Sequence, residues 1–549
     1  MKNQIYYQSI ISSIFLHFKP LNNKQMKKTI INSLLILTVL IFCDFATAQK
    51  TAIPKATEPE GCTNILVGKK ASADGSTMTS HSCDSNTDRT WINLVPNKKH
   101  EKGAMCPIYA ESKRTKGPND PDAKKIGEIP QVRETYAYIN TAYAVMNEHQ
   151  LAIGESTFDG KLELHSEEGI LDCPELYRLV LERAKTARQA IKVIDELTKE
   201  FGYNDFGECF TFADPNEIWH FEILGPGKGK KGAVWAAVRI PDDEVGVSAN
   251  SSRIRQINLK DKENYMASDN VFSLAEELGF WSKDSGKPFE FCYAYASRTS
   301  VGSRRREWRV LSLVAPSLKL DPNNENHPFS VKTEKKLTVK DVLSIFRNYY
   351  QDTDYDMTRS LKAVDKEGNN IKSPIANPFM NSDHRKLHNI AYERTICCER
   401  ATYLFVTQSR NFLPNEIGGV VWLGYDNPAT TPHTPFYCGI SEMPKSYTID
   451  GREKFRKDCA WWAFRRVSKL CGIRYQPMSK DVEKVWQEIE NNAFANQEDF
   501  EKRMKELLKK DPKKAREEIT KYTKDLANKA VAKYWELGDK LWTDYNYKF

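Results

Sequence analysis

The chain has 549 residues, of which 40% are hydrophobic and 28% charged, and its formal net charge is +8. This composition is that of a globular protein with a full hydrophobic core, in one large domain or two, and it excludes disordered and fibrous classes. Half of the excess positive charge lies in residues 1–61, and no basic run is interleaved with aromatic residues, so nucleic acid is excluded as a partner.

The N-terminal region has the pattern of an export signal. Lys27 and Lys28 precede an apolar run of 13 residues, Ile30–Phe42, and Ala46–Ala48 supplies the small residues that signal peptidase reads. A permanent span needs about 20 apolar residues. We therefore expect a cleaved signal over residues 1–48, translation from Met26, and a periplasmic or secreted protein with no stable membrane span. An uncleaved anchor is the alternative.

A short leader and a pair of strands follow the signal. Residues 49–61 (QKTAIPKATEPEG) hold two prolines, several charges and few apolar residues, which is typical of a flexible leader. The pattern then changes to the β-rich run Thr63–Gly68, the turn Ala73–Ser76 and the short run Thr77–Ser82. This order predicts a strand, a turn and a strand directly after the leader.

Strands and helices alternate irregularly after that. The predicted strands are residues 135–146, 150–155, 219–223, 232–239 and 246–249, and the predicted helices are residues 174–201, 271–278 and 339–347. The Lys-, Pro- and Gly-rich stretch at 96–130 is expected to be a loop or an insertion at a cleft. Because the order shows no regular βαβ rhythm, we predict an α+β fold, with a sheet sandwich covered by helices.

The C-terminal segment changes composition to Lys, Glu and Ala with little Gly or Pro, as in residues 500–508 and 512–541. We expect a catalytic domain over residues 62–475 and a helical extension over 476–549. Because basic and acidic residues are mixed, a solvated helical pair that packs on the main domain is favoured over a partner-binding arm. The pattern leaves a homo-oligomer open.

The cysteines do not form the framework of a small disulfide-rich domain. They are scattered over the whole chain and include no CxxC pair: Cys43, Cys62, Cys83, Cys106, Cys173, Cys209, Cys292, Cys397, Cys398, Cys438, Cys459 and Cys471. One or two disulfides are compatible with this spacing. His384 and His388 have helical spacing but lack the glutamate of an HExxH motif, so no metal site is expected there.

Cys62 stands where an N-terminal nucleophile would stand. It follows a glycine, comes directly after the leader and opens a predicted strand. A thiol with a pKa of about 8.5 needs a base, and cleavage before Cys62 would create an α-amine, with a pKa of about 7.7 to 8.0, on the same residue. Gly61 would give the backbone the freedom that self-cleavage requires. The residues alone also fit an ordinary buried thiol.

Three runs of the sequence resemble one enzyme family. They are CTNILVGKKASADGSTM at Cys62–Met78, MNEHQLAIGEST at Met146–Thr157 and FADPNEIWHFEILG at Phe212–Gly225. They look like the N-terminal-nucleophile cysteine dipeptidases, which include the secernins and are distantly related to bile salt hydrolases and penicillin V acylases. The likeness covers about residues 62–470. It implies an αββα sandwich, with the nucleophile on an inner strand, that hydrolyses small peptides through a thioester without a metal or other cofactor.

The resemblance also implies roles for individual residues. Cys62 would attack the peptide carbonyl, and Asp84 would orient the α-amine. Asn147 and Asn250 would donate their side-chain amides to the oxyanion, each worth about 3 to 4 kcal/mol when pre-positioned. Without the family, Asp84 and Asn147 would be turn residues and Asn250 a strand-end cap.

The chain departs from the family at one position, and at another it offers several candidates for a family arginine. Many members carry an arginine three residues before the aspartate, where this chain has His81. His81 would contact the nucleophile or bind the substrate carboxylate, with only partial charge near neutral pH. The region of a late family arginine holds Arg304, Arg305, Arg306 and Arg309. We favour Arg306; the alternative is a solvated loop.

These observations predict an exported cysteine dipeptidase that cuts itself between Gly61 and Cys62 and cleaves short peptides with a free N-terminus. One alternative keeps the nucleophile but changes the substrate to an acyl amide, as in bile salt hydrolases and penicillin V acylases. Another is an inactive, peptide-binding member of the fold, which the missing arginine allows.

Overall fold

The computed structural model describes residues 61–115, 120–121, 123–298 and 300–548. The predicted signal and the predicted leader up to residue 60 lie outside the described residues. The chain divides into two units, Met1–Pro59 and Glu60–Phe549, and the following description concerns the second.

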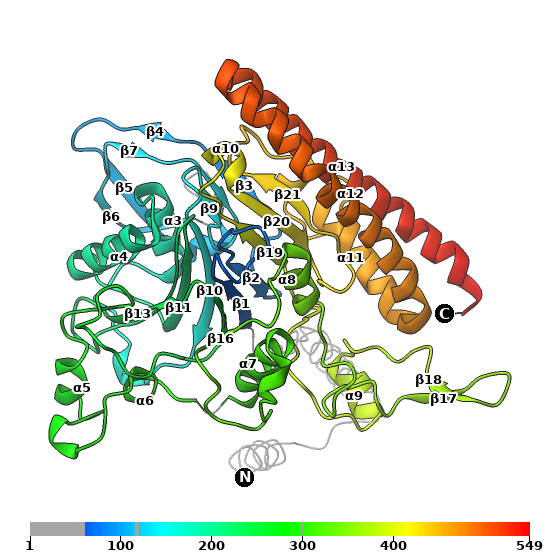
Figure 1. Cartoon of the computed structure of the whole chain (residues 1–549), viewed down its shortest axis with the longest axis horizontal. Helices are drawn as coiled ribbons and strands as arrows, with labels where there is room; N and C mark the ends of the chain where they lie inside the picture. The colour runs from blue at the N-terminus through cyan, green and yellow to red at the C-terminus, as the bar shows by residue number, and fades with distance from the viewer. Residues whose placement is uncertain (1–60, 116–119, 122, 299, 549) are drawn as a thin grey trace, which may run out of the picture. The chain divides into compact units, whose positions relative to one another are not determined.

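Two antiparallel sheets form the centre of this unit (Figure 1). The first sheet has seven strands, in the order β16 (Ser330–Lys332), β14 (Glu244–Ser248), β1 (Gly61–Val67), β2 (Ser80–Asp84), β19 (Tyr403–Gln408), β20 (Val420–Tyr425) and β21 (Thr434–Tyr437). β1 lies between β14 and β2 and is buried along its whole length. It is therefore an inner strand, as the resemblance implied.

The second sheet has eight strands and packs against the first. Its order is β15 (Tyr265–Ala267), β13 (Val234–Ile240), β12 (Ile218–Leu224), β11 (Gly207–Ala213), β10 (Ala152–Phe158), β9 (Met146–Asn147), β8 (Tyr138–Asn140) and β3 (Asn93–Val95). Ser156 Oγ of β10 lies 2.5 Å from Ser248 Oγ of β14. A Cβ at Gly154 would meet Ser80 O at 2.3 Å. Glycine is therefore required where β10 crosses the first sheet.

Helices pack on both sheets. α3 (Cys173–Arg183) and α4 (Ala187–Phe201) contact the second sheet, whereas α7 (Val301–Val314), α8 (Val339–Phe346) and α11 (Ala460–Cys471) contact the first. The chain also contains shorter elements: β4 (Lys98–Lys99), β7 (Glu134–Thr135), α5 (Ser273–Glu277), α6 (Phe291–Tyr295), β17 (Lys362–Val364), β18 (Asn370–Lys372), α9 (Ser382–Leu387) and α10 (Asn415–Gly418). The predicted α+β class is confirmed.

Three predicted elements differ from the structure. The single strand predicted over residues 135–146 is divided into β7, β8 and β9, and β8 pairs with β9. The helix predicted over residues 174–201 is broken after Arg183, and Thr186 caps the second helix by accepting a hydrogen bond from Gln189 N. The apolar spacing continues on both sides of the break, so periodicity alone does not reveal it. The expected loop at 96–130 contains a strand pair, β5 (Met105–Ala110) and β6 (Lys124–Pro130).

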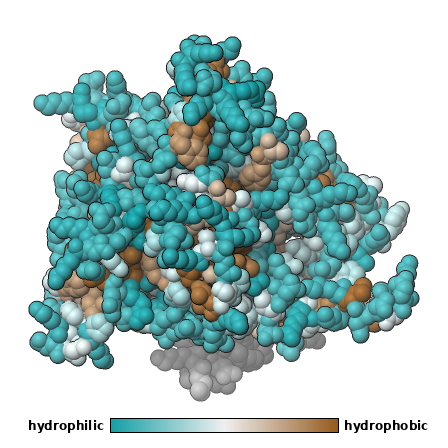
Figure 2. Space-filling model, viewed as in Figure 1, coloured by the Kyte–Doolittle hydropathy of each residue, from teal (hydrophilic) through white to brown (hydrophobic). Residues whose placement is uncertain are grey.

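The C-terminal helices are α12 (Tyr475–Lys510) and α13 (Pro512–Tyr545). Buried carboxylates of α12 pair with arginines of the preceding part of the unit, since Glu490 lies 2.6 Å from Arg347 and Glu501 lies 2.8 Å from Arg410. Hydrophilic residues cover most of the face seen in Figure 2. Within the part of the chain that the structure describes, no helix is both long enough and apolar enough to cross a membrane.

The eleven described cysteines are all buried and free. The expectation of one or two disulfides is therefore not met among them. Their side chains serve as small buried groups, as free cysteine commonly does, and the pair at Cys62 and Cys83 is considered further below.

Candidate active site

Cys62 is the second residue of β1, and both of its backbone groups are held. Its N–H donates to Asn250 Oδ1 at 3.0 Å, and its carbonyl accepts from Arg306 Nη1 at 2.8 Å. Its sulfur faces His81 and Glu155, and the side chain is only 7% exposed. Cys62 is thus a buried thiol with a fixed backbone, and in this structure it is still joined to Gly61.

Asn250 holds the nitrogen that would become the α-amine. It follows β14 with φ 58°, a left-handed conformation that asparagine adopts more readily than most residues. Its Oδ1 accepts from Cys62 N at 3.0 Å and from Arg306 Nη2 at 2.9 Å. Its Nδ2 donates to Thr157 O at 2.6 Å. Asn250 therefore lies at the site, but its oxygen anchors the nitrogen in a role that the sequence had assigned to Asp84.

Arg306, on α7, is the one of the four candidate arginines that contacts Cys62. Besides the Cys62 carbonyl, it donates to Thr63 Oγ1 at 2.9 Å and to Ala249 O at 3.1 Å. Burial and the nearby Arg394 lower the pKa of Arg306 to about 10, so it stays cationic at neutral pH. It ties the start of β1 to the end of β14.

Arg305 and Arg309 are directed elsewhere. Arg305 pairs with Glu393 at 2.7 Å, and Arg309 donates to Asn348 Oδ1 at 3.0 Å. The choice among the arginines therefore follows from helix geometry, because only one face of α7 meets β1.

Gly61 has an extended conformation, and its backbone pairs with Asp84 across β1 and β2. A Cβ at this position would lie 2.4 Å from Asn250 Oδ1. The backbone is therefore not bent at Gly61 in this structure, and the freedom that self-cleavage would require of it stays a prediction. Glycine is needed because the Asn250 side chain lies against its Cα.

Asp84 forms a buried ion pair with Arg394. It does not hydrogen-bond to Cys62 N, so its predicted role as the orienter of that nitrogen is not realised in the uncleaved chain. Burial raises the pKa of Asp84, and the Arg394 cation opposes this shift. Arg394 Nη2 also lies 3.5 Å from the Gly61 carbonyl oxygen. The ion pair therefore lies next to the Gly61–Cys62 peptide bond, which self-cleavage would break.

His81 is fully buried, with Nε2 3.2 Å from Glu155 Oε2. Tyr143, Tyr403 and Phe405 surround its ring edge to face. A side chain enclosed in this way cannot bind a substrate carboxylate, so the substrate-binding assignment is corrected. His81 contacts the nucleophile, which was the other role weighed.

The charges at this cluster are strongly coupled. Burial would lower the pKa of His81, but Cys62 and Glu155 raise it to about 10. Burial would raise the pKa of Glu155, but His81 lowers it to about 2. The Cys62 pKa is raised by its hydrogen bond to Cys83, by burial and by Glu155, against His81. At neutral pH the cluster is an imidazolium–carboxylate pair beside a thiol.

The His81–Glu155 pair should make stability depend on pH. The His81 pKa rises from 6.5 to about 10 on folding, so its contribution is complete below pH 6.5 and is lost as the pH rises towards 10. The Glu155 pKa falls from 4.5 to about 2, so its contribution is lost only as the pH falls below 4.5. Urea unfolding should therefore give a lower free energy at pH 9 than at pH 6. His81→Gln should remove most of this difference, and an equal decline in that variant would contradict the assignment.

Cys62, His81 and Glu155 also form a possible metal-ligand set, since their ligand atoms lie within 4.8 Å of one another. Sulfur, imidazole and carboxylate are ligands that zinc accepts. A metal on the sulfur would block it as a nucleophile, so we assign these groups to the thiol chemistry. His384 and His388 form no such group with the other described residues.

Asn147 does not lie with the other predicted residues. Its Nδ2 donates to Leu181 O at 2.9 Å and to Ala184 O at 2.8 Å, while its Oδ1 accepts from His149 N and Leu151 N. Both amide protons are used to join β9 to the end of α3. The prediction that Asn147 donates to an oxyanion is therefore wrong, and the residue serves the fold.

Sequence reasoning missed Glu155, Thr157 and Arg394. Glu155 gave a signal, because an acidic residue inside the apolar strand run LAIGESTF must be paired if it is buried. Thr157 accepts a hydrogen bond from Asn250 with its backbone carbonyl. A backbone contact of this kind cannot be predicted from the type of side chain. Arg394 comes from a segment 310 residues after Asp84, and no spacing rule joins the two.

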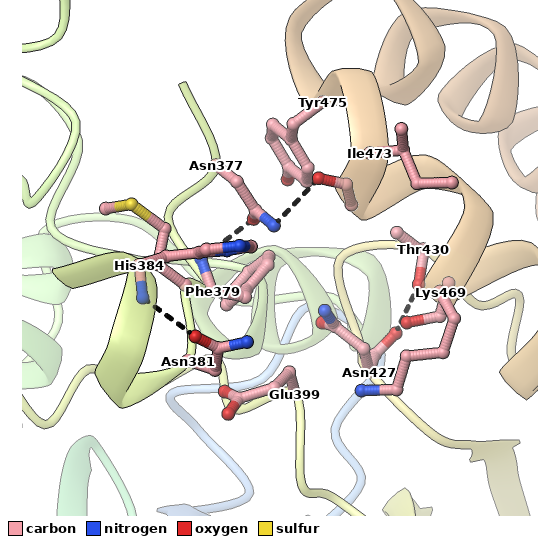
Figure 3. A pocket seen from close by; sticks show the side chains of 13 residues that line it. Asn377, Phe379, Asn381, His384, Glu399, Asn427, Thr430, Lys469, Ile473 and Tyr475 are labelled. Carbon is pink, nitrogen blue, oxygen red and sulfur yellow. Dashed lines mark hydrogen bonds between the residues drawn. The ribbon is translucent and has the colours of Figure 1, made fainter. Parts of the chain in front are cut away.

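Two cavities share part of their lining, and the smaller of them reaches Arg394. The larger, of about 270 Å³, is shown in Figure 3, and its polar lining includes Asn377, Asn381, His384, Glu399, Asn427 and Lys469. A smaller cavity shares Phe379, Met380 and Glu399 with it and is also lined by Arg394. Cys62 itself lines neither. Among the residues of the site, Arg394 therefore borders the smaller cavity.

Comparison with known proteins found a matching family model and several similar proteins. A model of peptidase family C69 matches residues 61–488, beginning at the first residue of β1. A probable dipeptidase of Latilactobacillus sakei is 26% identical over 433 residues, 76% of this chain and 82% of its own. A probable dipeptidase B of Lactococcus lactis subsp. lactis (strain IL1403) is 28% identical over 75% of this chain and 82% of its own. Another from Streptococcus pyogenes serotype M3 is 22% identical over 87% and 92%.

Proposed function

The chain belongs to peptidase family C69, and on that premise we propose that this cysteine-type peptide hydrolase is an exported dipeptidase that frees Cys62 by cutting its own Gly61–Cys62 bond. The proposal rests on the contacts that fix the backbone and surround the sulfur of Cys62. Asn250 and Arg306 fix its nitrogen and its carbonyl, while its sulfur faces His81 and Glu155. Structural thiols need no such arrangement.

Self-cleavage begins with attack of Cys62 Sγ on the Gly61 carbonyl carbon. The S–C bond forms, the C–N bond breaks, and the thiol proton ends on the departing nitrogen, which becomes the α-amine. Water then hydrolyses the thioester and releases the leader. Arg394, 3.5 Å from the carbonyl oxygen, would stabilise the negative charge that develops there. Before cleavage Cys62 N is an amide and cannot be a base, so the imidazolium of His81 assists by favouring the thiolate.

The freed amine then serves peptide hydrolysis. Asn250 Oδ1 already accepts a hydrogen bond from this nitrogen at 3.0 Å, and the same contact would hold the amine beside the sulfur. The amine takes the thiol proton, the thiolate attacks the peptide carbonyl, and the proton passes to the leaving amine. Water hydrolyses the resulting thioester.

Short peptides with a free N-terminus are the substrates that we propose. The names of the similar proteins, probable dipeptidase and probable dipeptidase B, support the same substrate class. Turnover of dipeptides should exceed that of glycine-conjugated acyl amides; the reverse order would favour an acyl-amide hydrolase.

N-terminal sequencing and intact mass of the purified protein test the proposal. The wild-type chain should begin at Cys62, whereas Cys62→Ala should remain uncut and inactive. If export removes the signal, the uncut variant should begin at Gln49. Cys471→Ala, a change at another buried cysteine, should be processed normally. A folded, active wild-type protein that keeps residues 49–61 would count decisively against the proposal.

A further inference from the structure

We propose that Cys62 and Cys83 form a reversible disulfide that switches the nucleophile off. The two residues are direct partners across β1 and β2. Partners on adjacent antiparallel strands point to the same face of the sheet, so the two side chains lie side by side. The functional consequence rests on the proposed role of Cys62, but the bond itself does not.

The backbone hydrogen bonds show which kind of strand pair this is. Cys62 N donates to Asn250 and Cys62 O accepts from Arg306, so both groups point away from β2. Cys83 O accepts from Thr402 N at 2.7 Å, away from β1. The two residues therefore form a non-hydrogen-bonded pair, in which Cα atoms are about 4.5 Å apart and side chains approach most closely. Disulfides span Cα separations of about 4.4 to 6.8 Å.

The two thiols are strand partners that lie close enough to interact, and the Cys83 side chain raises the pKa of Cys62. Cys83 Sγ also donates to Asp88 Oδ2 at 3.4 Å. Cys62 is 7% exposed whereas Cys83 is fully buried, so an oxidant meets Cys62 first and Cys83 second.

The chemistry requires an oxidant such as a peroxide. The Cys62 thiolate attacks the peroxide, which gives a sulfenic acid on Cys62 and releases water or an alcohol. The Cys83 sulfur then attacks the sulfenic sulfur, the S–S bond forms, and a second water leaves. Two external thiols restore both groups by successive exchange and leave as a disulfide of their own. While the bond exists Cys62 has no thiolate, so the peptidase is off and its sulfur is protected from further oxidation.

The test uses the mature protein exposed to hydrogen peroxide, blocked with an alkylating reagent and digested without reductant. Mass spectrometry should find the peptide of Cys62 linked to the peptide of Cys83. Dipeptidase activity should fall and return on addition of dithiothreitol. In Cys83→Ala the sulfenic acid has no thiol to capture it and is oxidised further, so recovery should be at least about tenfold lower.

Cys471→Ala, which changes a buried cysteine on α11, should behave like the wild type. Absence of the linked peptide when Cys62 is oxidised would overturn the proposal, as would full recovery of the Cys83→Ala variant. Because the linked peptide is read by mass, it remains decisive if Cys83→Ala fails to fold. It also separates this inference from the proposed function, since the bond would form even in a chain that cleaves no peptide.

Discussion

Asp84→Asn is expected to block cleavage at Gly61 and to lower the free energy of unfolding by about 3 to 5 kcal/mol, the usual cost of leaving a buried charge without its partner. The carboxylate is fully buried and is paired with Arg394. Removing the charge leaves the Arg394 guanidinium uncompensated inside the protein. It also loosens the cation that lies 3.5 Å from the Gly61 carbonyl oxygen.

Urea unfolding and intact mass measure the two effects separately. In the double variant Asp84→Leu/Arg394→Met, apolar groups replace both charges, and such replacements are often neutral for stability. We therefore expect the double variant to recover stability but to remain uncut. Normal processing in the double variant would show that the pair serves only the fold. Normal stability of Asp84→Asn would contradict the buried ion pair.

Local patterns in the sequence were sufficient for the centre of the fold. The leader is polar and rich in proline, and the run after Gly61 is apolar and β-branched, so the start of β1 could be placed from residues alone. The break between α3 and α4 could not, because the apolar spacing continues across Ala184 and Thr186. The strand pair β5 and β6 was missed for a related reason. Only Cys106, Ile108 and Ile129 in it are buried, so the alternation of apolar and polar residues is weak.

The site was predicted where chemistry is local and missed where it depends on chain folding. The place of Cys62 after a leader made it a candidate, and family resemblance made it the predicted nucleophile. Asn250 and Arg306 followed from family resemblance, although Asn250 proved to hold the nitrogen with its oxygen. Arg394 could not be found, because the turns that bring it to Asp84 lie far along the chain. Asn147 was misassigned because its motif is equally consistent with a structural role, the role that it has.

Like Asn250, Arg306 positions the backbone of Cys62 and does not contact its sulfur. Its guanidinium donates one hydrogen bond to the Gly302 carbonyl of its own helix. It donates four more across the site, to the Cys62 carbonyl, Thr63 Oγ1, the Ala249 carbonyl and Asn250 Oδ1. A lysine cannot make all of these, because its single ammonium group lacks the planar fork of donors. Arg306→Lys should therefore behave more like Arg306→Met than like the wild type.

We expect Arg306→Met to slow both self-cleavage and dipeptide hydrolysis by about 100-fold or more, since displacement of a reacting group by about 1 Å has that effect. Asn250 would lose one of its two anchoring donors, and the Cys62 nitrogen would no longer be held in a single position. Arg305→Met is the matched control, because Arg305 is also buried on α7 but pairs with Glu393. The rate at which the uncut chain disappears, followed by intact mass, measures the effect in both variants. If Arg306→Met is cut as fast as Arg305→Met, Arg306 does not position the nucleophile, and Asn250 alone must hold the nitrogen of Cys62.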